Sequence, residues 1–268
     1  MLQKEVIFLI IFTLISSSFQ GGCKSNRFSG SIPESSIKKI IDDINQKRQT
    51  LANGIETGLN DKTFPKATNM NKVFWNKELE KKAQAWADTL VKECTFEHNK
   101  DQKLGSITIG ENLYKSSLSS ILTLENLELE FINADNAWWN EKKDYNVNDV
   151  LLVKFAMGTG HFTQMAWAET SEMGCGYALY EDDRFASNQL VVCNYIPAGN
   201  FIGQSIYTIG DACSECKEGK SCNKELPGLC GGNGYYITTN GNSDSVVTPS
   251  TTPEPSNKTN SSYVKVSY

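Results

Sequence analysis

The chain has 268 residues, of which 26 are basic and 31 acidic, so its net charge is -5 with neutral histidines. This balance provides no basic surface for phosphate groups and argues against a nucleic-acid partner. The length is sufficient for one sizeable domain with appendages.

The chain begins with the features of a cleaved secretory signal. Residues 6–15 are largely apolar, and the small side chains of Ser16 to Ser18 follow them. So short a run cannot span a bilayer as a helix, which needs about 20 residues. We predict that residues 1–22 are a signal peptide, that the protein is secreted and extracellular, and that it has no membrane-spanning segment.

Two helices are expected early in the chain. A capping-box pattern, Ser31-x-x-Glu34, opens a segment whose isoleucines recur at helical spacing as far as Leu51. A second helix is expected over residues 76–94, where apolar side chains three or four positions apart share one face. His98 follows directly after the end of this second helix.

A third helix is expected from about residue 120 to residue 142. Glu141 lies three positions beyond Trp138 and continues the apolar stripe of this helix. An unpaired charge on a buried face is costly, so the Glu141 carboxylate should have a partner.

Strands are expected later. Two β-rich runs, residues 173–179 and 190–195, flank a polar loop and predict a β-hairpin. The midpoint between Cys175 and Cys193 falls inside that loop. Pairing about the turn therefore sets the two cysteines opposite each other and favours a disulfide between them.

Eight cysteines remain if cleavage precedes Cys23, and an even count in a secreted chain indicates a disulfide framework. Four of them lie in residues 205–230, which predicts a small module held by disulfides. The spacing Cys213-x2-Cys216 suggests a zinc knuckle or a redox pair in a cytosolic protein. Secretion argues against both, because an oxidising compartment removes the thiolates that a metal needs.

The composition separates a globular part from a tail. Residues 32–204 have the apolar patterning of one packed domain. Residues 231–268 are rich in Gly, Ser, Thr, Asn and Pro, and we predict a disordered tail there. Asn257 and Asn260 each begin an N-glycosylation sequon.

Four phrases occur in the order found in one protein family; they are residues 94–98, 110–114, 160–167 and 193–201. They resemble the signatures of the CAP superfamily, which includes cysteine-rich secretory proteins, wasp venom antigen 5 and plant pathogenesis-related proteins of group one. The sequence near Trp75 and before the cysteine cluster is most similar to the venom-allergen-like secreted proteins of roundworms.

This resemblance implies an α/β fold: a three-layer α-β-α sandwich, the CAP domain, over residues 32–204. It also implies that residues 205–230 are the cysteine-rich hinge that follows that domain in some relatives. The implied hinge disulfides are Cys213–Cys222 and Cys216–Cys230, and they leave Cys23 to pair with Cys94.

The resemblance also implies a site. In the family, two histidines and two glutamates line a central cleft, and the histidines can bind a divalent ion, usually zinc. The corresponding residues are His98, His161, Glu111 and Glu141, and the two histidines are the only ones in the chain. Two imidazoles alone make a weak, open site, which water and one carboxylate would complete.

The loop before His161 contributes to sterol binding in some relatives. Here it contains an aliphatic run, which we interpret either as an extra core strand or as the wall of a lipid cavity. The lipid-binding candidates are Val150, Leu151, Leu152, Val153 and Phe155.

We therefore predict first a secreted, non-catalytic module that binds a lipid or sterol, or an extracellular host protein or receptor, in a host-interaction or immunomodulatory role, with weakly bound zinc. A weak metal-dependent hydrolase is the second hypothesis, since a carboxylate beside zinc-bound water can activate it. The sequence contains neither His-Glu-x-x-His nor Gly-x-Ser-x-Gly, which counts against hydrolysis. A purely structural extracellular domain is the third.

Overall fold

The computed structural model describes residues 23–24, 26–28, 30–119, 127–154, 157–232 and 237–238. The predicted signal peptide, nearly all of the predicted tail with Asn257 and Asn260, and Phe155 lie outside these residues. The helices are α1 (Glu34–Ala52), α2 (Lys77–Glu93), α3 (Leu127–Asn140) and α4 (Gly160–Ala166), with 3-10 turns η1 (Leu59–Asp61), η3 (Glu141–Asp144) and η4 (Val147–Asp149). The strands are β1 (Asn26–Phe28), β2 (Phe74–Asn76), β3 (Lys103–Leu104), β4 (Ile107–Thr108), β5 (Gly110–Leu118), β6 (Glu172–Tyr180), β7 (Ser187–Ile196) and β8 (Ile237–Thr238).

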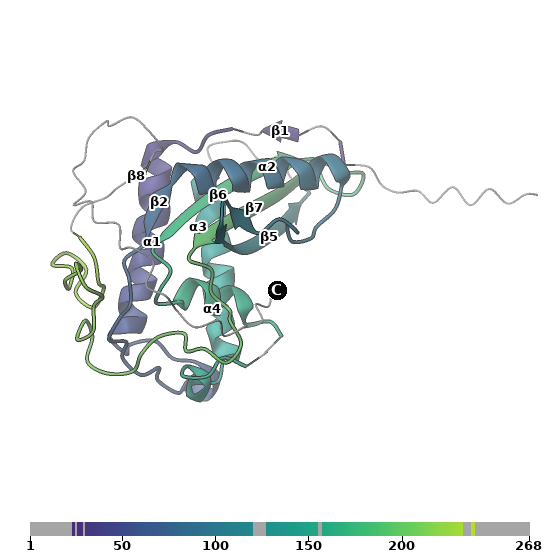
Figure 1. Cartoon of the computed structure of the whole chain (residues 1–268). Coiled ribbons are helices and arrows are strands. Elements are labelled where there is room, and N and C mark those ends of the chain that lie inside the picture. Colours follow the sequence, from purple (N-terminus) through teal and green to yellow (C-terminus); the bar gives the residue numbers. More distant parts are fainter. Residues whose placement is uncertain are drawn as a thin grey trace, which may run out of the picture.

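The elements form three layers (Figure 1). The central sheet has the strand order β5-β7-β6-β2-β8, and β1 pairs with β6. Helix α2 packs against β6 and β7, while α1, α3 and α4 pack together and also contact β2, β5 and β7. A smaller hydrophobic core lies under α2, and a larger core lies between the sheet and the other helices. The predicted α-β-α sandwich is confirmed.

Helix α1 begins later than the capping-box pattern predicted. Its first residue is Glu34, and no side chain caps its first turn. The predicted cap at Ser31 is wrong, because Ile32 precedes Pro33 and a residue before proline is disfavoured in the helical conformation. The isoleucine stripe is buried as its spacing predicted, and the helix ends at Ala52.

Helix α2 is fixed closely against β6. The Asn76 side chain caps its start by accepting two backbone N–H bonds. Gly174 and Gly176 leave room for the helix backbone, since a Cβ at either position would lie 2.3 Å from a backbone nitrogen of α2. The Gln84 side chain also donates to the Tyr177 carbonyl and accepts from the Tyr177 N–H, both at 2.9 Å.

The predicted hairpin is confirmed. Strands β6 and β7 are antiparallel, Cys175 lies opposite Cys193, and a disulfide joins them. Strand β5 pairs with the other edge of β7, where Glu111 lies opposite Asn194. The hairpin therefore supports the strand that carries Glu111.

The third predicted helix is confirmed in part. Phe131, Ala134 and Trp138 on α3 are buried, as the stripe predicted. The described helix ends at Asn140, so Glu141 begins the η3 turn rather than continuing the helix. Residues 120–126, where this helix was expected to begin, lie outside the described part of the chain.

All eight cysteines form disulfides. The pairs are Cys23–Cys94, Cys175–Cys193, Cys213–Cys222 and Cys216–Cys230, the pairing that was expected. Residues 205–230 contain only isolated bridges in place of helices and strands, so disulfides and loop contacts hold this segment. No helix within the described ranges is both long and apolar enough to cross a membrane.

Candidate metal site

The first half of the site pairs His98 with Glu111. His98 lies in the loop after α2, and this loop starts from a fixed point because Cys94, the helix C-cap, is bonded to Cys23. The His98 Nδ1 atom lies 2.8 Å from Glu111 Oε1, and the Asn99 N–H donates to the same oxygen at 2.9 Å. The Glu111 side chain is 1% exposed and the His98 side chain 21% exposed.

The second half pairs His161 with Glu141. The Nδ1 atom of His161, the second residue of α4, lies 2.6 Å from Glu141 Oε1. Glu141 Oε2 accepts the backbone N–H groups of His161 and Phe162 at 2.9 and 3.1 Å. The carboxylate thus caps α4, whose own N-cap residue makes no capping hydrogen bond with its side chain. The partner expected for Glu141 is therefore His161.

A polar contact connects the two halves. Asn112, next to Glu111 on β5, donates to the backbone carbonyl of His161 at 3.2 Å. The Trp138 ring stacks on the His161 ring with centroids 6.0 Å apart. Strand β5, which carries Glu111, and helix α4, which carries His161, are in contact. We refer to His98, Glu111, Glu141 and His161 together as the His–Glu site.

The hydrogen bonds of the two imidazoles determine which ring nitrogen of each can bind a metal ion. When Nδ1 donates to a carboxylate, the Nε2 atom of a neutral imidazole carries the free lone pair. Both carboxylates already accept several hydrogen bonds. In addition to the contacts above, the Asn194 amide donates weakly to Glu111 Oε2 at 3.4 Å. The arrangement resembles the carboxylate–histidine pairs that orient metal ligands. The donor chemistry of two imidazoles, each with a carboxylate on Nδ1, is of a kind that fits a divalent ion.

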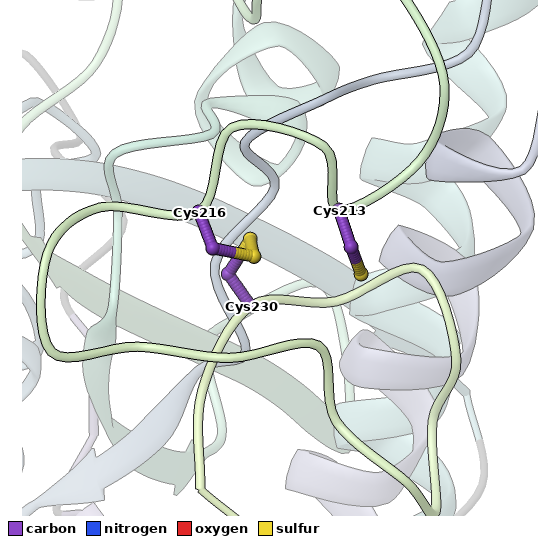
Figure 2. Close-up of side chains that lie close together, drawn as sticks. All are labelled: Cys213, Cys216 and Cys230. Atoms are coloured by element: carbon purple, nitrogen blue, oxygen red, sulfur yellow. A yellow bond between two sulfur atoms is a disulfide. The ribbon is translucent and has the colours of Figure 1, made fainter.

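Within the described residues, one group of three metal-type side chains has ligand atoms within 4.8 Å of one another, and it is not the His–Glu site. It consists of Cys213, Cys216 and Cys230 (Figure 2). Their sulfurs are bonded in disulfides in this structure, so they are not thiolate ligands.

The aliphatic run before His161 divides into two groups. Val150 and Val153 are buried in the larger core, whereas Leu151 is 56% exposed and Leu152 is 52% exposed. The segment is a turn rather than an extra strand. A lipid contact through this loop would therefore depend on the two leucines, since the valines have no free surface.

Sequence reasoning missed the buried Arg48. Its guanidinium donates to the carbonyls of Met165 and Trp167 at 2.6 and 2.9 Å, at the end of α4, and also to Asn71 O. Burial lowers the Arg48 pKa to about 9. The sequence signal is its register, since Arg48 lies four residues after Ile44 on the apolar face of α1 and must therefore be buried.

Asp135 on α3 is the second buried group that was missed. The residue is 1% exposed, and its Oδ2 atom has no hydrogen-bond partner within the described structure. Burial raises the Asp135 pKa to about 8, and Asp135 in turn adds to the burial effect that raises the pKa of Tyr195. The Tyr195 hydroxyl lies 3.4 Å from the amide of Asn112, the residue next to Glu111.

Comparison with known proteins finds one matching family model and similar sequences and structures. Residues 41–195, more than half of the chain, match the family model described as CAP: Cysteine-rich secretory protein family. Scoloptoxin SSD976 of Scolopendra dehaani is 35% identical over 238 residues, which are 86% of this chain and 98% of that protein.

Two solved structures show the same fold. BmVAL-1 superimposes with a TM-score of 0.64 at 30% identity, over 76% of this chain and 97% of its own. NaASP2, solved with Zn2+, gives a TM-score of 0.60 at 30% identity, over 78% of this chain and 100% of its own. Both solved structures are of roundworm venom-allergen-like proteins, the group that this sequence resembles most.

Proposed function

The chain belongs to the cysteine-rich secretory protein (CAP) family, and we propose that it is a secreted, non-catalytic binding protein with a weak divalent-metal site. The ligands are the Nε2 atoms of His98 and His161. The observation that carries this proposal is that a carboxylate engages Nδ1 of each imidazole, at 2.8 and 2.6 Å. A bound zinc ion would act there as a Lewis acid.

The glutamates orient the histidines and do not act as bases. Glu111 accepts bonds from a ring nitrogen, a backbone N–H and the Asn194 amide. Glu141 accepts from a ring nitrogen and two backbone N–H groups. A general base in a hydrolase must reach the attacking water, and oxygens held in this way are poorly placed to do so. We therefore prefer the non-catalytic function over the hydrolase.

Secretion is supported by two features of the chain. The apolar start has the form of a signal peptide. All eight cysteines are oxidised, which is typical of proteins from an oxidising compartment. We propose extracellular partners: a lipid or sterol, or a host protein or receptor.

Calorimetry with zinc tests the metal site. We expect weak binding to the wild-type protein, because two protein ligands are fewer than a structural zinc site provides. Binding should weaken in acid, because protons compete with the metal for imidazole. The variant His98→Ala with His161→Ala should give no binding heat above dilution. Equal heats for the two proteins would refute the site.

A lipid-retention assay tests the loop. Exchanging Leu151 and Leu152 for Asp should remove most bound sterol or fatty acid, since each buried CH2 contributes about 0.8 kcal/mol. The matched control exchanges Ile55 and Ile107, exposed apolar residues elsewhere, for Asp. Unchanged lipid retention in the leucine variant, or equal loss in the control, would contradict lipid binding at this loop.

A further inference from the structure

A cavity of about 420 Å³ lies where α1, β2 and the hinge segment, residues 205–230, meet. Small-molecule sites have volumes of about 300 to 1,000 Å³. The apolar part of its lining consists of Ile41 from α1, Phe74 from β2 and Leu226 from the hinge. Two lysines and two carboxylates supply the charged part, and none of the lining residues belongs to the His–Glu site. The cavity is therefore a second candidate site.

Lys72 lines this cavity and is held in place by the hinge. Its backbone N–H donates to Cys230 O at 2.9 Å. Its Cβ lies beside Gly231, where an added Cβ would be 3.3 Å away. The residue is 5% exposed, and its Nζ atom lies 5.5 Å from the centre of the Phe74 ring. The Lys72 amine therefore lies against the aromatic part of the cavity lining.

The surroundings of Lys72 favour its neutral amine more than water does. Burial lowers the Lys72 pKa below its usual 10.5 and has the largest effect. The carboxylates of Glu225 and Asp42 partly offset this effect, and the Lys38 ammonium adds to it. Lysine nucleophiles are typically desolvated or placed near a second cation, because only the neutral amine has a lone pair for attack.

We propose that the Lys72 amine captures aliphatic aldehydes in this cavity as a Schiff base. The neutral nitrogen attacks the carbonyl carbon, and a carbon–nitrogen double bond replaces the carbon–oxygen bond. Both amine protons leave with the carbonyl oxygen as water, so amine and aldehyde give imine and water without an oxidant or reductant. The Glu225 carboxylate lines the same cavity and can relay these protons.

The lining suits an aldehyde better than a charged ligand. Its two lysines and two carboxylates balance in charge, and Lys38 is already paired with Asp42. An uncharged carbonyl compound enters such a cavity without the cost of desolvating a charge of its own. Its aliphatic chain would contact Ile41 and Leu226, and this contact gives the site a preference for longer chains.

Adduct mapping on the full, disulfide-bonded protein tests the proposal. Hexanal is added with cyanoborohydride, which reduces the imine to a stable secondary amine, and peptide masses locate the adducts. Lys72 should be modified roughly tenfold or more ahead of the exposed Lys81, because a reactant held in a cavity has a raised local concentration. Lys220 is the matched control, since burial also lowers its pKa but its Nζ donates to Asn71 Oδ1 at 3.0 Å outside the cavity lining.

Two comparisons separate the cavity from general amine chemistry. Acetaldehyde offers only one methyl group to the apolar lining, so it should show a smaller preference for Lys72 than hexanal does. Lys72→Arg keeps the charge but forms no imine, and it should lose the early adduct, whereas Lys220→Arg should keep it. The proposal is overturned if Lys220 or Lys81 reacts as fast as Lys72, if acetaldehyde shows the same preference as hexanal, or if Lys72→Arg leaves the early adduct yield unchanged.

Discussion

The His–Glu site and the C-terminal hinge both gather metal-type side chains, but they hold them in opposite chemical states. At the His–Glu site, carboxylates engage one nitrogen of each imidazole and leave the other open. At the hinge, the sulfurs are consumed in disulfides although they lie closer together. Residue type and proximity therefore do not define a metal site; the protonation and oxidation states of the ligand atoms do. The first region should respond to protons and the second to reductants.

The largest expected effect comes from the buried Asp135 on α3. Its pKa is raised by burial from 3.8 to about 8 in the folded protein. The unfolded chain releases the Asp135 proton near pH 4, whereas the folded protein keeps it until about pH 8. The stability that Asp135 contributes is therefore fully present below about pH 4 and is lost as the pH rises toward 8. The free energy of unfolding should fall over this range by on the order of 5 kcal/mol. Urea unfolding of Asp135→Asn between pH 4 and 9 should show a flatter profile than the wild type.

The control for this experiment is Asp101→Asn, an exposed carboxylate paired with Lys82. Its profile should follow that of the wild type. An unchanged pH profile in Asp135→Asn would show that the buried carboxyl does not make this half of the molecule proton-sensitive.

A smaller effect is expected from the glutamates that orient the imidazoles. Glu111→Gln and Glu141→Gln should each lower zinc affinity by roughly 10- to 100-fold, because an amide orients the ring and raises its basicity less well. Zinc titration calorimetry measures the effect, with Glu78→Gln, a partner of surface Lys81, as the control. If either exchange left affinity within twofold of the wild type, that glutamate would not support its histidine.

The sequence was sufficient for much of the fold and for the residues of the candidate site. Apolar periodicity predicted α2, and alternation predicted the β6–β7 hairpin with Cys175 opposite Cys193. These features depend on local patterns. The resemblance supplied the set of four site residues, because each lies in a distinctive phrase.

Other features depend on long-range contacts and were not predictable. Val150 and Val153 are buried, whereas Leu151 and Leu152 are exposed. This difference follows from a turn that no local sequence pattern predicts. The wrong cap at Ser31 followed from a motif that ignored Pro33. The carbonyls of Met165 and Trp167 that Arg48 binds come from residues more than a hundred positions away, so only its register could indicate burial.

The most direct test of the central claim is a zinc titration followed by the nitrogen chemical shifts of the two imidazoles. The central claim is that one ion is held by both histidines through Nε2, while Nδ1 donates to Glu111 or Glu141. We expect both Nε2 resonances to shift together and saturate at one zinc per chain, while both Nδ1 atoms keep their protons. A shift confined to one histidine, or coordination through Nδ1, would contradict the account.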